Sequence, residues 1–310
     1  MFVTVIICTR NRASQLCNVL DSFIAMDKPS EDWEMLLVDN GSSDNTQEVI
    51  NSYKDKLPIR SVIEETPGLS NARNTGVKNA TGEYICWTDD DVKVDEKWLV
   101  GYVEAFKKYP DAVVFGGVVE PVAETEFPKW WVENAKLLEH IVATRNLGDE
   151  YISLSVDKNM LPYGANFAVR AKEQREEIYD INLGVSPLIK RLGEETDVII
   201  KLMRKHKSGI WNPVSKVFHY IPAKRLTKEY IAIYYQSVGE TAAYLSTEGK
   251  YNFIRQVSGR YKINNKPFWV YKEYFITFLK YHWFKQLKNT KKSLEFLIEN
   301  NFYNGFLSYK

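Results

Sequence analysis

The sequence predicts an α/β fold in which helices cover both faces of a mostly parallel β-sheet. Short apolar runs, each about as long as a strand, alternate with segments of helical periodicity through the first half of the chain. Gly, Pro, Asn and Asp cluster between these segments, as they do in turns. This alternation is typical of parallel sheets whose strands are joined by crossover helices.

Each element is expected from its own local pattern. Apolar runs predict strands at residues 3–8, 33–38, 59–63, 84–88 and 112–119. Helical spacing, clearest in the recurrence of Leu16, Val19, Leu20 and Phe23, predicts helices at residues 13–26, 46–54, 69–80 and 96–108. After a less regular stretch at 121–160, the pattern predicts a turn and strand at 163–170, a helix at 194–205 and a strand at 214–220. From residue 223 the chain is expected to be helical.

Bulk composition narrows the classes of function. A chain of 310 residues can hold one large α/β domain with an appendage. Its net charge of +1 gives no field that favours nucleic acid as a partner. Three cysteines without a Cys-x-x-Cys pair suit a reducing compartment. With no signal-peptide pattern and no uncharged run long enough for a membrane span, we expect a cytoplasmic location.

Three consecutive aspartates, Asp89, Asp90 and Asp91, follow the apolar run at residues 84–87, with Thr88 between them. Like charges at this density repel one another unless a cation or water screens them. Carboxylate oxygens are preferred ligands of Mg²⁺ and Mn²⁺, and these ions hold diphosphates. The triplet therefore indicates a divalent-metal site for a nucleotide diphosphate. The alternative is a solvated acidic turn before the next helix.

Polar residues also end the first two predicted strands. Thr9, Arg10 and Arg12 follow the first strand, where they could contact a base or a phosphate. Asp39 and Asn40 follow the second, where Asp39 could accept hydrogen bonds from a nucleobase or a ribose hydroxyl. Ligands of such sheets bind at the carboxyl ends of the strands. The alternative at both places is ordinary capping of the following helix.

Two glycine-containing segments are further candidates for donor contacts. Gly68 allows close backbone approach before a predicted helix, and Asn71 and Arg73 in that helix could favour an anion. Gly164 also admits close contact, and Asn166 beside it can both donate and accept hydrogen bonds. Taken singly, each segment is equally consistent with a structural role.

Glu194, Glu195 and Asp197 open the predicted helix at 194–205. Carboxylates this close together raise one another's pKa, which suits a general base that works near neutral pH. The alternative is a favourable interaction of acids with the helix dipole in the first turn.

A final motif surrounds His219, at the end of an apolar strand. His219 could join Asp89 and Asp91 as a metal ligand, or it could orient a phosphate. Arg225, shortly after the strand, could clamp a diphosphate with two hydrogen bonds. A lone histidine is otherwise often a structural residue.

These motifs, in this order, resemble those of the family 2 glycosyltransferases, which have the Rossmann-like GT-A fold. Six segments in the correct order make the resemblance specific, although none is decisive alone. Accordingly, we expect a GT-A catalytic domain at residues 1–225 and a helical region at residues 226–310. The matching segments read VIICTRNR, LLVDNGSSDNT, PGLSNARNTGVKNATGEYICWTDDDV, YGANFAVR, GEETDV and VFHYIPAKR.

The resemblance implies roles for several of these residues. Asp39 would bind the nucleobase of a nucleotide-sugar donor, and residues 89–91 would hold the ribose and a diphosphate bound to Mg²⁺ or Mn²⁺. An acid of the GEETD segment would be the catalytic base, and transfer would invert the anomeric centre. The family usually has Gly-Glu-Asp at this place. Glu195 stands where that aspartate would be, so it is the first candidate, with Glu194 and Asp197 in reserve.

Residues 255–292 form the most basic part of the chain, with ten Lys and Arg residues against the single acid Glu273. Many Phe, Tyr and Trp residues are interleaved with them. A basic, aromatic helix fits contact with a membrane surface at headgroup level, which predicts a peripheral location on the inner face of the cell membrane. The alternative is a helical subdomain that packs its aromatics on the catalytic domain or on a partner in a homodimer.

The motifs and the resemblance together predict a metal-dependent glycosyltransferase, and the resemblance implies that it inverts the anomeric centre. Its acceptor would be a glycan or lipid-linked hydroxyl in the synthesis of cell-surface polysaccharide or glycolipid, and its donor is expected to be a UDP-sugar by family frequency. One alternative is a non-catalytic protein that binds nucleotide sugars or acts as a membrane scaffold. Another is a sugar nucleotidyltransferase, against which the absence of glycine from the segment VIICTRNR argues.

Overall fold

The computed structural model describes residues 1–187, 190–250 and 259–309, which form two compact units. The first unit contains Met1–Val122, Ala143–Ile189 and Glu194–Tyr220. The second contains Ala123–Val142, Lys190–Gly193 and Ile221–Lys310. Residues 123–142 therefore group with the C-terminal helices, although they precede residue 225 in the chain.

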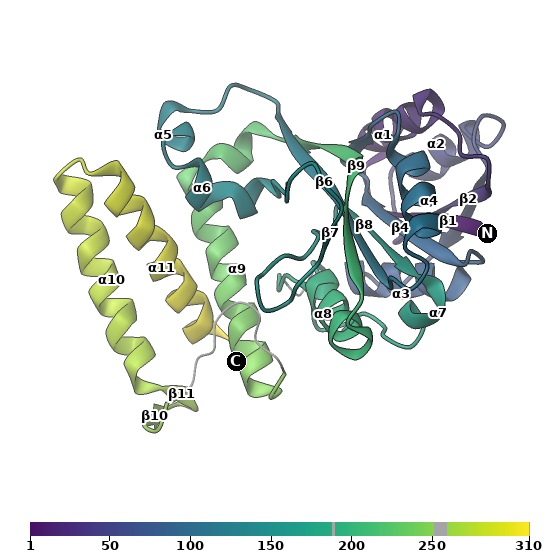
Figure 1. Ribbon diagram of the computed structural model, residues 1–310. Helices are drawn as coiled ribbons and strands as arrows, with labels where there is room; N and C mark the ends of the chain where they lie inside the picture. Colours follow the sequence, from purple (N-terminus) through teal and green to yellow (C-terminus); the bar gives the residue numbers. More distant parts are fainter. Residues whose placement is uncertain (188–189, 251–258, 310) are drawn as a thin grey trace. The chain divides into compact units, whose positions relative to one another are not determined.

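The first unit is built on a mixed sheet with the strand order β3-β2-β1-β4-β8-β6-β9-β5, and β7 pairs with β9 (Figure 1). Strands β1 to β4 are parallel, whereas β8 is antiparallel to β4 and to β6, and β9 is antiparallel to β5 and to β7. The predicted α/β class is confirmed. The strands are β1 (Phe2–Thr9), β2 (Asp32–Asp39), β3 (Ile59–Ile63), β4 (Tyr84–Asp89), β5 (Val92–Val94), β6 (Val114–Ala123), β7 (Ile152–Ser153), β8 (Asn166–Arg170) and β9 (Gly209–Ile221).

Helices pack on both faces of the sheet because its central strands are apolar on both sides. In β1, Val3, Val5 and Ile7 belong to the same core as the buried residues of α1 and α4. Ile6 points the other way and meets α3, where a Cβ added to Gly76 would lie 2.9 Å from Ile6 Cγ2. The helices of this unit are α1 (Ala13–Ala25), α2 (Thr46–Ser52), α3 (Leu69–Asn79), α4 (Trp98–Lys108), α7 (Ala171–Gln174) and α8 (Glu194–His206).

Strands β5 and β7 were not predicted from the sequence. They are three and two residues long, too short for an alternating pattern to be recognised. β5 nevertheless matters for the site. It follows the aspartate triplet immediately and pairs with β9, so that Val92 lies opposite His219.

The second unit is helical, as expected for the end of the chain, apart from a short hairpin. Helix α11 packs against both α9 and α10. Two glycines bring the backbones of α9 and α11 together: a Cβ on Gly305 would lie 1.9 Å from the Gln236 carbonyl oxygen, and one on Gly239 would lie 2.0 Å from that of Phe302. The elements are α5 (Lys129–Val132), α6 (Ala135–Leu138), η1 (Glu139–Val142), η2 (Ala223–Leu226), α9 (Lys228–Thr247), β10 (Lys262–Ile263), β11 (Lys266–Pro267), α10 (Phe268–Gln286) and α11 (Thr290–Ser308).

The basic segment at residues 255–292 lies mostly in this hairpin and in α10 and the start of α11. Arg255, one of its ten basic residues, is outside the described part of the chain. None of the helices that the structure describes has both the length and the apolar character needed to cross a bilayer.

Candidate active site

The pairing register aligns the carboxyl ends of three neighbouring strands. Thr9 lies opposite Asp39 between β1 and β2, and Cys8 lies opposite Asp89 between β1 and β4. Because these strands are parallel, their polar ends meet at one edge of the sheet, which is where α/β folds bind ligands. Thr9 itself is 3% exposed. The structure therefore brings together the ends that the sequence marked separately.

The aspartate triplet is held by Arg12 from the turn after β1. Arg12 Nη1 lies 2.8 Å from Asp90 Oδ1 and 2.9 Å from Asp91 Oδ2. Burial raises the pKa of Asp90 to about 7, although the nearby Arg12 charge opposes that shift. Arg12 is thus committed to the triplet in this structure, where it screens two of the three carboxylates.

His219 reaches the triplet through the pairing of β5 with β9. The Asp91 carbonyl oxygen accepts a hydrogen bond from the Tyr220 backbone nitrogen at 3.0 Å. This places His219 Nε2 3.5 Å from Asp91 Oδ1, with both side chains largely buried. An imidazole nitrogen and a carboxylate oxygen, more than a hundred residues apart in the chain, are therefore neighbours at the edge of the sheet.

Arg73 of α3 links the triplet to the acids of α8. Its Nη2 lies 3.4 Å from Asp89 Oδ1, while its Nη1 lies 2.5 Å from Glu194 Oε1 and 3.4 Å from Glu195 Oε2. The Arg73 side chain is only 4% exposed. Its guanidinium also lies over the ring of Tyr179, with 5.6 Å between the guanidinium carbon and the ring centroid. We call Arg73, Asp89, Glu194 and Glu195 the acid–arginine network.

This geometry changes the expected role of Arg73. A guanidinium buried among three carboxylates has little surface left for an incoming phosphate. Its contacts instead fix the positions of Asp89, Glu194 and Glu195 relative to one another. Tyr179, which the sequence reasoning missed, supports it from the side. The isolated tyrosine lies in a segment without any recognisable motif, so no signal in the sequence marked it.

The three acids of α8 have different surroundings. Glu194 is buried against Arg73, and its burial, together with the negative charge of Glu195, raises its pKa to about 8. Asp197 is also buried and forms an ion pair of 2.6 Å with Lys201 one turn further on. The Glu195 side chain is 22% exposed and has the longer contact with Arg73. Of the three, it is the one best placed to meet a substrate.

Gly164 packs directly against Glu195. A Cβ at Gly164 would lie 2.8 Å from Glu195 Cγ and 2.9 Å from Cδ, closer than normal contact distances. The absence of a side chain at this position therefore leaves room for the carboxylate. Gly164 was predicted to contact the donor, but in the structure it contacts Glu195, the candidate for the base. The sequence did not predict this contact.

Asn166 does not point into the site, contrary to expectation. Its side chain is completely buried and makes four hydrogen bonds. Its oxygen accepts from Trp98 Nε1 and from the Tyr102 hydroxyl, both at 2.8 Å. Its amide nitrogen donates to the carbonyl oxygens of Val118 and Ser215. Because these bonds use every donor and acceptor site of the amide, none remains for a nucleotide.

Asp39 and Asn40 organise the turn after β2. Asp39 Oδ1 accepts from the Ser42 backbone nitrogen at 2.8 Å, and its Oδ2 accepts from Gln47 Nε2. The Asn40 side-chain amide donates to two backbone carbonyls of the loop at residues 64–66, and its oxygen accepts from the Gly68 nitrogen at 2.7 Å. Asn40 therefore ties two loops together. Gln47, which contacts Asp39, was not among the predicted residues.

Arg10 extends this arrangement, because its Nη1 donates to the Asn40 carbonyl oxygen at 3.0 Å. Asn71, in the first turn of α3, donates from Nδ2 to the Pro67 carbonyl oxygen over a long contact of 3.4 Å. Its side chain lies beside Gly68, where an added Cβ would be 3.2 Å from Asn71 Nδ2. Gly68 has a φ of 142°, a conformation that favours glycine.

The start of α3 is already occupied by another part of the chain. The Leu69 backbone nitrogen donates to the Val185 carbonyl oxygen at 3.0 Å, and the Ser70 hydroxyl donates to that of Leu183 at 2.6 Å. The Leu69 N–H and the Ser70 hydroxyl are thus already bound within the chain, which leaves less of this helix start open to an anion than the sequence suggested.

Arg225 lies in η2 of the second unit, with its guanidinium carbon 6.0 Å from the ring centroid of Tyr230. All the other predicted site residues belong to the first unit.

The triplet region fits a divalent cation that shares its coordination with phosphates. Within the described residues, no three or more His, Cys, Asp and Glu side chains form a ready-made cluster for a metal ion. Asp91 and His219 nevertheless provide adjacent oxygen and nitrogen donors, with Asp89 next to them. Mg²⁺ is commonly held by one or two carboxylates together with substrate phosphates, and Mn²⁺ accepts similar oxygen donors.

Known proteins resemble this chain in sequence and in fold. Poly(ribitol-phosphate) beta-glucosyltransferase from Bacillus spizizenii is 30% identical over 119 residues, which are 37% of this chain and 19% of that protein. The match covers 19% of the length of this glucosyltransferase, 33% of glycosyltransferase AglE from Haloferax volcanii and 26% of poly-beta-1,6-N-acetyl-D-glucosamine synthase from Staphylococcus epidermidis. The chain therefore spans a third or less of the length of these relatives.

Two solved structures share the fold. S. aureus TarS 1-349 in complex with UDP has a TM-score of 0.59 at 15% identity, covering 99% of this chain and 91% of that one. The mannosyltransferase PcManGT from Pyrobaculum calidifontis, in complex with GDP-Man and Mn²⁺, has a TM-score of 0.57 at 20% identity, covering 80% and 65%. The model of Glycosyl transferase family 2 matches residues 4–161, about half of the chain, and the chain belongs to that family.

Proposed function

We propose that this chain is an inverting glycosyltransferase that moves a sugar from a nucleotide-diphosphate sugar to a hydroxyl group of an acceptor. The acid–arginine network is the observation that carries this proposal. Through Arg73, the acid at the end of β4 and the acids at the start of α8 are held within a few ångströms of one guanidinium. Donor-binding and proton-accepting groups are thereby adjacent, as glycosyl transfer requires.

The donor end of the site would consist of residues at the strand ends. Asp39, with Arg10 and Asn40 beside it, is proposed to bind the nucleobase, and Asp89 and Asp90 the ribose and diphosphate. Asp91, Asp89 and His219 would hold Mg²⁺ or Mn²⁺. When bound, such an ion would neutralise charge on the departing diphosphate. The UDP complex of TarS and the complex of PcManGT with GDP-Man and Mn²⁺ support this arrangement.

The acceptor end would depend on Glu195. Its carboxylate would take the proton from the acceptor hydroxyl as that oxygen forms a bond to the anomeric carbon. The bond from the anomeric carbon to the diphosphate oxygen breaks at the same time, and the electron pair leaves with the nucleotide diphosphate. Attack from the side opposite the leaving group inverts the anomeric centre. General-base catalysis of this kind contributes about 10²–10⁴-fold to the rate.

Glu194 would hold Arg73 in place and leave Glu195 free to act. Its raised pKa follows from burial and from the charge of Glu195, and its short contact with Arg73 leaves it little freedom to meet a substrate. Asp197 is similarly engaged by Lys201. The exposed fraction of Glu195 therefore supports it over both neighbours as the base.

The acceptor is proposed to be a glycan or a lipid-linked glycan of the cell surface. The name of the relative that acts on poly(ribitol-phosphate) supports this class. Catalysis is proposed to take place in the part of the chain within residues 1–225. The chain is further proposed to work at the inner face of the cell membrane.

Calorimetric titration with UDP, GDP and dTDP, each with Mn²⁺ and with chelator, tests the donor site. We expect metal-dependent binding of one nucleotide that is lost in Asp91→Ala and kept in Glu195→Gln. The nucleotide that binds then defines the sugar donors for an activity assay with the same two variants. If no nucleotide binds in the presence of metal, the donor site is wrongly assigned. Binding without turnover of any donor would favour a non-catalytic nucleotide-sugar-binding protein.

A further inference from the structure

Helix α10 carries a row of large apolar side chains that the fold leaves exposed. Phe268, Phe275, Leu279 and Trp283 are 52%, 61%, 52% and 61% exposed. They are spaced seven, four and four residues apart, which places them along one side of the helix. We call these four residues the exposed stripe. Phe278 and Leu287, 42% and 58% exposed, flank it.

The opposite side of α10 accounts for the helix's packing. Val270 and Thr277 are buried, and α10 packs against α11. The Asn300 side-chain amide of α11 donates to the Tyr274 carbonyl oxygen at 2.8 Å. The contact with α11 therefore lies on the side of α10 opposite the exposed stripe. Contiguous exposed apolar side chains of this kind mark an interaction surface.

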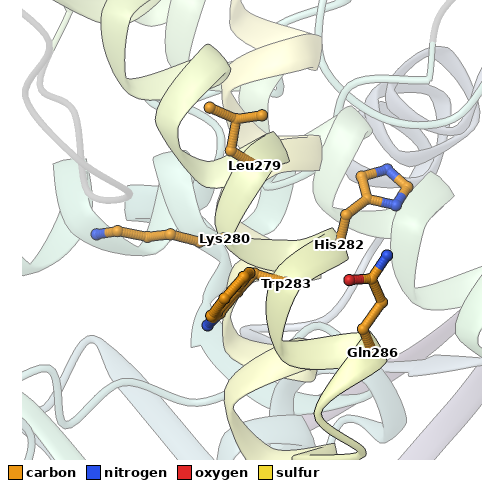
Figure 2. Close-up of a pocket in the computed structure, with 5 residues that line it drawn as sticks. All are labelled: Leu279, Lys280, His282, Trp283 and Gln286. Atoms are coloured by element: carbon orange, nitrogen blue, oxygen red, sulfur yellow. The ribbon is translucent and has the colours of Figure 1, made fainter.

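Basic side chains lie along the same helix. Lys272 and Lys280 are exposed within α10, and Lys285 and Lys288 are exposed near its end. Figure 2 shows Lys280 and Trp283 extending from one side of the helix, and His282 and Gln286 from the other, around a pocket that also includes Leu279. In the part of the chain that the structure describes, no acidic side chain forms an ion pair with Lys272, Lys280 or Lys285.

The positive charge of the chain is concentrated around α10. Residues 266–292 contain seven lysines and one glutamate, whereas the rest of the chain has five more acids than bases. A partner that meets α10 therefore faces strong positive charge beside apolar side chains. Anionic phospholipid headgroups complement the lysines, and the acyl boundary beneath them accommodates Phe, Leu and Trp. We propose that the exposed stripe and its lysines bind the surface of an anionic lipid bilayer.

Charge also distinguishes this partner from a second copy of the chain. In a symmetric dimer through α10, the lysines of both copies would face one another, and such like-charge contact is unfavourable. A nucleic acid would complement the charge, and Phe275 and Trp283 could stack on bases. The aliphatic Leu279 and Leu287, however, gain nothing from a base, whereas the acyl boundary of a bilayer accommodates them as well as the aromatic side chains. Neither argument depends on the proposed transferase activity.

Flotation with phospholipid vesicles tests the proposal on the full chain, without donor or metal. We expect the chain to float with phosphatidylcholine vesicles that contain phosphatidylglycerol, and to bind pure phosphatidylcholine far more weakly. The charge variant Lys272→Glu/Lys280→Glu/Lys285→Glu should lower partitioning on the order of a hundredfold. Its matched control, Lys54→Glu/Lys93→Glu/Lys97→Glu, changes the same charge at exposed positions of the first unit and should lower it much less.

A second variant removes the apolar contribution and keeps the charge. Phe275→Ser/Leu279→Ser/Trp283→Ser should reduce flotation at least tenfold, whereas Ile63→Ser/Val132→Ser/Ile178→Ser, at comparably exposed positions, should leave it nearly unchanged. All four variants alter exposed side chains, so circular dichroism should show a wild-type fold.

Three results would overturn the proposal. The first is failure of the folded wild-type chain to float with anionic vesicles at about 0.1 M salt. The second is a dimer, measured by light scattering, that the serine variant dissociates while vesicle binding is absent. The third is binding of a single-stranded oligonucleotide that the charge variant abolishes while vesicle binding is absent. Nucleotide titration is independent of all three, so a failure here leaves the donor site untouched.

Discussion

The acid–arginine network of the first unit packs charged side chains against one another, whereas α10 of the second unit leaves charged and apolar side chains exposed together. In the acid–arginine network, Arg73 is 4% exposed and contacts three carboxylates. On α10, the lysines face solvent beside Phe and Trp side chains. Because the charges of the network are buried, each one depends on its partners for compensation. Because the lysines of α10 are exposed, they can interact with a binding partner.

The largest effect on the rate should come from substituting Glu195, the proposed base of the acid–arginine network. Glu195→Gln keeps the shape of the side chain and removes its ability to take a proton. We expect kcat to fall about a thousandfold, with nucleotide affinity unchanged. Steady-state kinetics together with calorimetry would measure both. Equal losses in Glu194→Gln and Glu195→Gln at unchanged stability would contradict the division of roles between them.

Loss of Arg73 should show how much the buried charges depend on one another. Arg73→Leu leaves three carboxylates without their shared cation, and we expect the free energy of unfolding at neutral pH to fall by about 3–5 kcal/mol. Urea denaturation would measure this. Because the carboxylates can take up protons instead, the loss should shrink in acid. A variant as stable as the wild type at pH 8 would show that the network does not hold the site together.

Gly164→Ala should have a smaller and more specific effect. The added Cβ would lie within 3.0 Å of the Glu195 side chain, so the carboxylate must move. A displacement of the base near 1 Å should lower kcat about tenfold to a hundredfold while nucleotide binding stays constant. A variant with wild-type kcat would mean that the position of Glu195 seen here is not the catalytic one.

The pH dependence of stability should reveal the buried acids directly. The pKa of Glu194 is raised from its ordinary value of 4.5 to about 8, so the folded chain keeps a proton that the unfolded chain releases. Stability from this group is therefore present at low pH and is lost as pH rises through that window. In chelator, Glu194→Gln should make the fall in unfolding free energy between pH 5 and pH 8 clearly smaller. An unchanged slope would assign the effect to other groups.

The smallest effect should be on α10. Because Trp283 is 61% exposed, Trp283→Ser should change the free energy of unfolding by less than about 0.5 kcal/mol. Urea denaturation without lipid would measure this. A loss of several kcal/mol would show that Trp283 is buried in solution, and the contrast between the two regions would disappear.

The alternation of strands and helices, and the alignment of strand ends, could be predicted from local sequence. Asp39 and Asp89 each follow an apolar run, and parallel pairing brings such ends together without further information. His219 could be proposed as a metal ligand from its place at the end of an apolar strand, but its contact with Asp91 could not be predicted. The contact itself depends on β5, three residues that are too short to give a periodic signal.

Other features depend on long-range packing that local patterns do not encode. Asn166 looks like a ligand-binding amide in sequence, but Trp98 and Tyr102 from α4 take its oxygen. The start of α3 looks open until residues 183–185 occupy it. On α10, apolar residues surround the whole helix, so periodicity could not distinguish the side that packs on α11 from the exposed stripe.

The contact between Arg73 and Glu194 in the acid–arginine network also limits which segments of this chain can be exchanged with those of a relative. Arg73 and Glu194 are 121 positions apart, yet they share one buried contact. Substitutions at the two ends should therefore be strongly non-additive, and a double-mutant cycle between them should show coupling. A chimaera that exchanges only the first ninety residues would pair a foreign α3 with the native α8. A functional chimaera should therefore take α3 and α8 from the same parent, although the two helices are far apart in the sequence.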